Sequence, residues 1–305
     1  MAEPTATTTI DLARVLSGAQ LPALPQSAIR LLELSQNAKN GPVEFAIPIE
    51  ADPGLAGQVL KFVNSAYFGF SREISSVKLA ITMVGIRTIK NFALWSAVFS
   101  LMPNPKCGPF DLRSLWQDSL RRALFSRAFG KVLGMREAEE PFAAALLQDM
   151  AVPLLAKEIA GQYVDLLTQR EQGKVRLSQL ERERFGWTHA DAAAKMTRQW
   201  NLPEEFAALI ERHTEIESLV QSGGSPGQLA VALSSLLPAV TDDAWHQCEM
   251  FESYYRQLCP ESGPTVTEFL EKIDLEFIDF APVLKIATPA KSLLARYGEA
   301  TQLVL

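Results

Sequence analysis

Histidine and cysteine, the residues most often used in acid–base, metal and nucleophilic chemistry, are few in this chain. It has three histidines and three cysteines among 305 residues. No two cysteines form a Cys-x-x-Cys pair, and neither a Gly-x-Ser-x-Gly turn nor a glycine-rich phosphate loop occurs. His246 and Cys248 stand two apart in a predicted helix, so their side chains point in different directions. The residues alone therefore give no support to nucleophilic catalysis or to a phosphate-binding loop.

The other two histidines have ordinary structural explanations. Thr188 and Asp191 have the spacing of a capping box, which places His189 at the start of a helix. His213 follows a helical stretch, where a histidine interacts favourably with the helix dipole. A group of basic residues on the helix predicted from 111 to 133 is interpreted as a solvated face. These residues are Arg121, Arg122, Arg127 and Lys131.

The most specific local pattern covers residues 52–70. Asp52 is placed to cap a helix, and Pro53 fits its first position, where a missing N–H costs nothing. Leu55 and the apolar residues four and eight positions later give this helix one apolar face. The pattern ends at a polar corner, Asn64-Ser65, which is followed by the aromatic pair Tyr67-Phe68.

The composition is that of a globular protein with a modest negative charge. Hydrophobic residues make up 48% of the chain, the net charge is −6 and the pI is near 5.3. A general nucleic-acid binder needs a surplus of Lys and Arg, so none is indicated. The odd number of cysteines argues against a disulfide framework and favours a reducing cytoplasm. The N-terminus does not have the pattern of a signal peptide, and the longest uncharged run, residues 91–104, is too short to span a membrane.

Helical periods dominate the chain and strand signals are nearly absent, so we predict an all-α fold. We expect a flexible segment at residues 1–15, with a helix beginning near residue 10. An N-terminal bundle of about five helices follows at 16–102, then a second bundle at 110–220 and a C-terminal helical extension at 228–305. The Pro-rich stretch at 103–109 is the linker between the bundles. Helices of the second and third parts are predicted at 111–133, 141–158, 162–172, 228–237, 242–257, 266–280 and 282–297, with capping patterns at Ser178-x-x-Glu181 and Thr188-x-x-Asp191.

Several motifs in order make the chain resemble the HDOD family, the HD-related output domain of bacterial signalling proteins. LPALP at residues 21–25 is similar to the family's opening, and an amphipathic run at 27–34 follows it. The helix and corner at 52–70 come next, then ISSV at 74–77 and the Ala-Ile-x-x-Val-Gly pattern at 80–85. The resemblance covers residues 16–215, which are identified as the HDOD domain within the 16–220 region. It implies a two-part helical domain that regulates through partner proteins.

The second bundle also looks like the HD superfamily of metal-dependent phosphohydrolases. In catalytic relatives a His-Asp doublet helps to hold metal, whereas here Gln148 stands at the histidine position and Asp149 at that of the aspartate. The resemblance implies further ligand positions at Asp118, His189 and His213. The closing aspartate is missing, since only Ser234 and Ser235 are offered there and Asp242 and Asp243 lie too far on. A neutral amide at Gln148 weakens metal binding, so we expect a degenerate site with no metal, or a weak one if the remaining donors converge.

These features imply a non-catalytic bacterial signalling module in the cytoplasm that acts through protein contacts. We expect no cofactor, no nucleic acid and no membrane insertion, and a homo-oligomer stays open. Candidate partner-binding residues are Asn64, Ser65, Tyr67 and Phe68, although the polar pair can also cap the helix while the aromatics enter the core. Two alternatives are a residual metal-dependent phosphohydrolase and a nucleotide or cyclic-dinucleotide receptor with Arg122, Arg127 or Arg212 on the phosphates.

Overall fold

The chain folds into helices, as its periodicity predicts. A computed structural model describes residues 10–19, 23–35, 37, 39–136 and 138–302. These residues form eighteen α-helices and two 3₁₀ segments, with no β-strand among them. The expected disorder of residues 1–9, and Leu21 and Pro22 of the opening motif, lie outside the described residues. Helix α1 (Leu12–Gly18), capped by Asp11, is the helix predicted to begin near residue 10.

The N-terminal bundle contains five helices, the number that the sequence predicts. They are α2 (Gln26–Ser35), α3 (Pro42–Glu50), α4 (Pro53–Val63), α5 (Val77–Val84) and α6 (Ile86–Leu101). Asp52 caps α4 as expected, since its carboxylate accepts a hydrogen bond from the Leu55 N–H at 3.1 Å. Phe62 in the last turn of α4 stacks on Phe92 of α6, with ring centroids 4.2 Å apart. This aromatic contact joins α4 to α6 in the core of the bundle.

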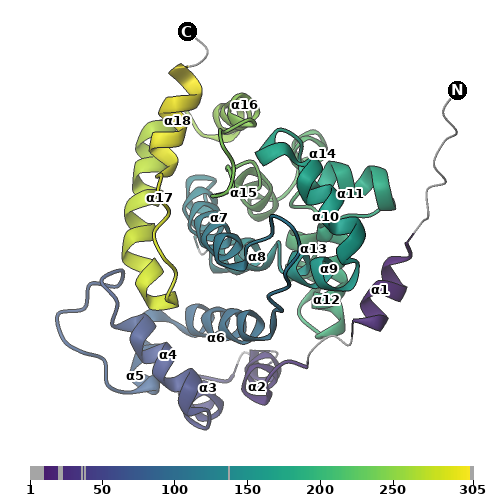
Figure 1. Ribbon diagram of the computed structural model, residues 1–305. Coiled ribbons are helices and arrows are strands. Elements are labelled where there is room, and N and C mark those ends of the chain that lie inside the picture. Colours follow the sequence, from purple (N-terminus) through teal and green to yellow (C-terminus); the bar gives the residue numbers. More distant parts are fainter. Residues whose placement is uncertain (1–9, 20–22, 36, 38, 137, 303–305) are drawn as a thin grey trace, which may run out of the picture.

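The second bundle follows the non-helical stretch after α6 and surrounds α7 and α8 at the centre of the molecule (Figure 1). Its helices are α7 (Leu112–Val132), α8 (Glu139–Leu147), α9 (Ala151–Glu158), α10 (Ala160–Gln169), α11 (Leu177–Phe185), α12 (His189–Gln199), α13 (Glu204–Glu211), α14 (Ile216–Ser222) and α15 (Pro226–Ser234). The 3₁₀ segment η1 (Glu171–Gly173) joins α10 to α11.

The single helix predicted at 141–158 is two helices, α8 and α9. Pro153 has no N–H to bond the carbonyl of Asp149, and its ring would clash with that carbonyl in a continuous helix. Residues 148–150 therefore form a turn, and Pro153 falls in the first turn of α9, where no such bond is needed. The break places Gln148 and Asp149 between two helices.

Of the two predicted capping patterns, one is confirmed and one is wrong. Thr188 and Asp191 form a full capping box at the start of α12. Helix α11 instead starts at Leu177, so Ser178 lies inside its first turn. The side chain of Glu181 is completely buried and bonds Tyr163 and His189. Because the Glu181 carboxylate accepts hydrogen bonds from these distant residues, it does not cap the start of α11.

The C-terminal helices are α16 (Cys248–Leu258), α17 (Val266–Phe280) and α18 (Leu293–Gln302), with the 3₁₀ segment η2 (Ala281–Leu284) before α18. Helix α17 has the predicted bounds. The helix predicted at 242–257 begins only at Cys248, because Arg296 binds the carbonyls of Val240 and Asp242 and holds that segment in a loop. His246 consequently precedes the helix in which it was expected.

The helix predicted at 282–297 is also wrong in its bounds. Lys285 has a left-handed backbone with φ of 55°, and Pro289 follows it, so the helix cannot run through this stretch. Helix α18 starts at Leu293, whose N–H donates to the carboxylate of Asp274 at 2.9 Å.

The helices after residue 228 pack back onto the earlier part of the chain. Helix α15 contacts α7 and α8, and α17 runs along α7 toward α4 (Figure 1). Phe269 of α17 packs against Phe125 and Phe129 of α7, and Phe280 reaches Phe62 of the N-terminal bundle. The sequence predicts this arrangement, because the apolar faces of these helices need an apolar surface to cover.

This packing also corrects the solvated basic face proposed for α7. Arg121 and Arg127 are only 2% and 3% exposed. Arg121 donates to the Lys291 carbonyl before α18, and Arg127 pairs with Glu276 of α17 at 3.1 Å. Only Lys131 of the four basic residues is exposed. Among the described residues, no helix is both long and apolar enough to cross a bilayer.

Candidate functional site

Three of the predicted site residues converge beside the turn between α8 and α9. Nε2 of His189 lies 3.2 Å from Oδ1 of Asp149 and 3.2 Å from Nε2 of His213. The distance from His213 Nε2 to the same carboxylate oxygen is 3.5 Å. Each side chain is at least 93% buried. His189 at the start of α12 and His213 after the end of α13 thus meet Asp149, although they lie 40 and 64 residues further along the chain.

Both imidazole rings are fixed from behind through Nδ1. Glu181 accepts from Nδ1 of His189 at 2.6 Å and from its backbone N–H at 2.8 Å. The Ile210 carbonyl, which can only accept, lies 2.6 Å from Nδ1 of His213. Each Nδ1 therefore carries a proton, and each Nε2 is directed at Asp149.

Arg122 of α7 pairs with the second oxygen of Asp149. Burial opposes ionisation of Asp149, but Arg122 and His189 hold the pKa of this carboxyl well below its usual range. Burial likewise opposes a charge on His189, yet Glu181 and Asp149 raise its pKa to about 10. Burial lowers the pKa of His213. At neutral pH two cations, Arg122 and His189, thus balance two carboxylates, and His213 is neutral.

The other predicted site residues lie nearby but outside this cluster. Asp118 of α7 accepts a hydrogen bond from the Val240 N–H at 2.8 Å, and burial raises its pKa to about 6. Gln148 is fully buried, and its Nε2 has no hydrogen-bond partner. Asp242 was placed too far along the chain, yet it faces the same cavity and pairs with Arg170 at 2.7 Å.

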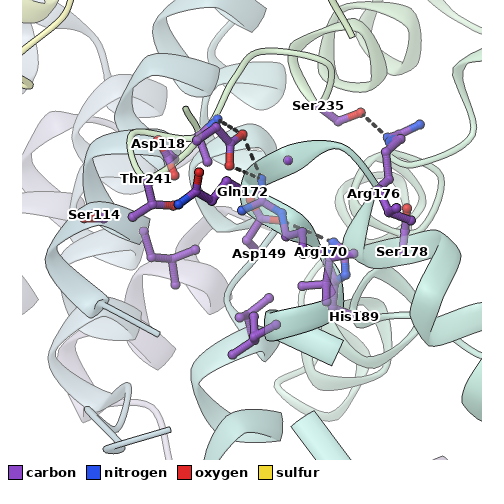
Figure 2. A pocket seen from close by; sticks show the side chains of 18 of the residues that line it. Ser114, Asp118, Asp149, Arg170, Gln172, Arg176, Ser178, His189, Ser235 and Thr241 are labelled. Atoms are coloured by element: carbon purple, nitrogen blue, oxygen red, sulfur yellow. Dashed lines mark hydrogen bonds and ion pairs between the residues drawn. The ribbon is translucent and has the colours of Figure 1, made fainter. Parts of the chain in front are cut away.

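A cavity of about 460 Å³ opens above the Asp149 cluster. Figure 2 shows that its wall is made by α7, the α8–α9 turn, the connector that carries Arg170 and Arg176, and the segment after α15. Of the three arginines proposed for phosphate contacts, only Arg122 lines it. Arg127 lies against the rings of Tyr67 and Phe142, and Arg212 bonds Glu215 and Ser218.

The donor set can be tested against a metal ion. Metal–nitrogen bonds of about 2.1 Å place neighbouring donors about 3 to 3.4 Å apart, which fits the observed spacings. The contacts through Nδ1 orient both rings as in known metal sites. Within the described residues this is the one cluster of three or more such donors. The donors therefore fit one ion in geometry, although His189 must first lose its proton and Arg122 already holds one oxygen of Asp149.

The predicted partner-binding corner is braced by the backbone and by aromatic packing. The amide of Asn64 bonds the N–H and carbonyl of Ile74 at 2.7 and 2.8 Å, and Ser65 donates to the Phe62 carbonyl. Tyr67 and Phe68 are half-buried, with ring centroids 4.9 Å apart. These contacts fit the alternative in which the polar pair holds the helix end and the aromatic pair packs against the core.

Sequence reasoning missed Glu181, Arg170 and Arg176. The only local signal at Glu181 was its three-residue spacing from Ser178, which was interpreted as a cap. Arg170 and Arg176 stand in a polar connector with no motif of their own. Their positions follow from the fold and not from the neighbouring residues.

Comparison with known proteins identifies the fold. Residues 21–216 match the HDOD domain. An uncharacterised protein of Treponema pallidum is 22% identical over 194 residues, which cover 62% of this chain and 37% of that protein. The chain thus matches little more than a third of that relative's length.

Solved structures share the fold at low identity. An HDOD domain protein of unknown function from Geobacter sulfurreducens has a TM-score of 0.63 at 19% identity, covering 96% of this chain and 93% of the other. A Marinobacter aquaeolei protein provisionally named for signal transduction has a TM-score of 0.65 at 18% identity, covering 92% and 66%. A Shewanella amazonensis protein provisionally named a phosphohydrolase has a TM-score of 0.62 at 19% identity, covering 94% and 97%. These likenesses extend the common fold to the helices beyond residue 216.

Proposed function

Because the chain belongs to the HDOD family, we propose that it is a bacterial, cytoplasmic signal-transduction module that works by binding and does not hydrolyse phosphoesters. The observation that carries this proposal is the buried ion pair of Arg122 with Asp149, next to the neutral amide of Gln148. The guanidinium and the protonated His189 already balance the nearby carboxylates. The name of the Marinobacter relative belongs to the same functional class.

Hydrolysis by metal ions places heavy demands on such a site. It needs a cation that binds firmly, an open coordination position and a water whose proton is easily lost. Gln148 brings no charge, and three donors suffice for one ion only. The pKa of His189 is about 10, so at neutral pH a proton competes with the metal ion for its Nε2. We expect metal affinity to be weak at pH 7 and to rise toward pH 10, as His189 loses its proton.

A residual metal-dependent phosphohydrolase is the second candidate, and the arrangement of Asp149, His189 and His213 favours it. These three side chains would hold the ion, and a bound ion would activate a water as a Lewis acid. Glu181 would keep the His189 ring oriented, and Arg122 would remain beside the second carboxylate oxygen. The name of the Shewanella relative belongs to this class.

Metal content and turnover distinguish the two candidates. We expect the purified protein to contain substoichiometric transition metal at pH 7 and to leave bis(p-nitrophenyl) phosphate intact when Mn²⁺ is added. His213→Gln removes one donor and serves as the matched variant, while His246→Gln changes a histidine outside the cluster. Stoichiometric metal and turnover that His213→Gln abolishes and His246→Gln preserves would establish the hydrolase and overturn our proposal.

Protein contacts are best supported on the N-terminal bundle. Large apolar side chains there are 41% to 64% exposed, on two helices, α3 and α5, that pack against each other. They are Val43, Ile47, Leu79 and Met83. Exposed apolar side chains that gather on one part of a surface mark protein interaction sites. We place the contact with a signalling protein on this α3/α5 surface.

A further inference from the structure

Charge pairing in the cavity leaves two charged groups without a direct ion pair. Arg122 faces Asp149, and Arg170 faces Asp242. Among the residues that the structure describes, Arg176 has no carboxylate within ion-pair distance and Asp118 has no such cation. Figure 2 shows these two side chains well apart on the cavity wall, with Arg170 and Asp149 between them.

Arg176 is held firmly by partners that carry no charge. Its Nη1 donates to the Thr214 carbonyl at 3.3 Å, and its Nη2 donates to the Ser235 hydroxyl at 2.9 Å. A guanidinium has five N–H donors, so three remain, in a planar fork suited to two oxygens of a phosphate or carboxylate. The side chain is thus fixed beside the cavity without a direct ion pair.

Gln148 and Asp118, which also face the cavity, have unused capacity for hydrogen bonds. Gln148 is fully buried, and its Nε2 has no acceptor. Buried amide donors nearly always have a partner, and an oxygen of a ligand in the cavity would supply one. Asp118 uses one carboxylate oxygen on the Val240 N–H, which leaves the other to accept from a ligand.

We propose that the cavity binds one small molecule with an anionic phosphate or carboxylate at one end and a hydrogen-bond donor at the other. Arg176 meets the anion, Asp118 accepts from an ammonium or amino group, and Gln148 donates to an oxygen between them. The volume of about 460 Å³ lies in the range of about 300–1,000 Å³ that is usual for small-molecule sites. This inference rests on the proposed function, because it assigns to binding the cavity in which the rival hydrolase would act.

Calorimetric titration of the full chain with two sets of probes tests the proposal. The phosphate set is adenosine 5′-monophosphate with its fragments, adenosine and inorganic phosphate. The carboxylate set is 6-aminohexanoate with hexanoate. In one set, we expect the two-ended probe to bind at least tenfold more tightly than its fragments. The set that succeeds identifies the anion.

Three variants assign the contacts. Arg176→Gln should lower the affinity for the successful probe at least tenfold. Arg176→Lys should lower it less, because lysine keeps the charge without the planar fork. Asp118→Asn should weaken the two-ended probe and leave the binding of the anionic fragment unchanged. Arg184→Gln is the matched control, because this exposed arginine lies on α11, the helix that begins just after Arg176. Thermal melts of all variants verify folding.

The outcomes separate this inference from the proposed function. If neither two-ended probe binds more tightly than its fragments, or if Arg176→Gln behaves like Arg184→Gln, the ligand site is wrong and the proposed signalling function stands. If a probe binds through Arg176 and is then hydrolysed, the site is right and the non-catalytic function is wrong.

Discussion

The molecule has two polar clusters, the corner after α4 and the centre around Asp149. Their polar side chains find hydrogen-bond and charge partners in different ways. At the corner, Asn64 and Ser65 are satisfied by backbone groups within ten residues along the chain. At the centre, charged side chains from distant segments satisfy one another beside a cavity. The corner supports the fold, whereas the centre keeps groups in place that a ligand can reach. We therefore place the proposed ligand site at the centre, where polar groups border a cavity, and not at the corner.

The largest expected effect is that of Asp149→Ala. The substitution leaves Arg122 buried beside a protonated His189, with no carboxylate between them. Removing one partner of a buried ion pair costs about 3–5 kcal/mol, so we expect the free energy of unfolding to fall by that amount. Urea denaturation at pH 7 measures it. Asp149 thus holds the fold as well as the site, and a signalling defect in this variant has to be compared with its stability.

A double variant separates the charge from the packing around it. Arg122→Leu combined with Asp149→Ala removes both charges, and we expect the pair to be less destabilised than the sum of the two single variants. If the two single effects simply add, the ion pair makes no net contribution and the comparison of the two clusters fails.

Tyr67→Ala tests whether the corner after α4 supports the fold. The Tyr67 ring lies 5.3 Å from that of Phe280 and under the guanidinium of Arg127, so it joins the N-terminal bundle to α7 and α17. Because the ring is only half-buried, we expect a loss of about 2 kcal/mol, below the values for fully buried aromatics. Tyr67→Phe, which keeps the ring, should stay within about 0.5 kcal/mol of the unmodified protein. A partner lost in Tyr67→Phe at unchanged stability would instead make the corner a contact surface.

The sequence predicts those features of the fold that local chemistry decides. Asp52 and Thr188 mark helix starts because their side chains cap N–H groups within three residues. Long-range contacts decide the rest. Arg296 holds residues 240–242 in a loop where the periodicity favoured a helix, and Glu181 serves His189 in place of a cap. At the candidate site, the resemblance to the HD superfamily suggests Asp149, His189 and His213, but only the fold brings them together and adds Arg176.

Asp118→Asn is expected to stabilise the protein while weakening the binding of the proposed ligand. Burial raises the pKa of Asp118 from 3.8 to about 6, so ionisation becomes unfavourable in the folded state. The stability this group gives is complete below pH 3.8 and is lost as the pH rises through 6. We therefore expect Asp118→Asn to be more stable by about 1 kcal/mol at pH 8, with little difference at pH 4. Melts across this pH range measure the change, and an equal gain at both pH values would show that the carboxyl charge is not responsible.

The smallest change in stability is expected at Ile47, where the functional effect should be large. This side chain is 64% exposed on α3, so Ile47→Ser removes little buried area and should alter the free energy of unfolding by less than about 0.5 kcal/mol. If the α3/α5 surface binds the signalling partner, loss of an apolar anchor should weaken that contact by about 1–2 kcal/mol. Leu275→Ser is the matched control, because Leu275 is 60% exposed on α17. Partner capture from the native cell, quantified for both variants against the unmodified protein, decides the question. Equal capture by all three proteins would remove the α3/α5 surface from the signalling contact, and loss with Leu275→Ser alone would move that contact to α17.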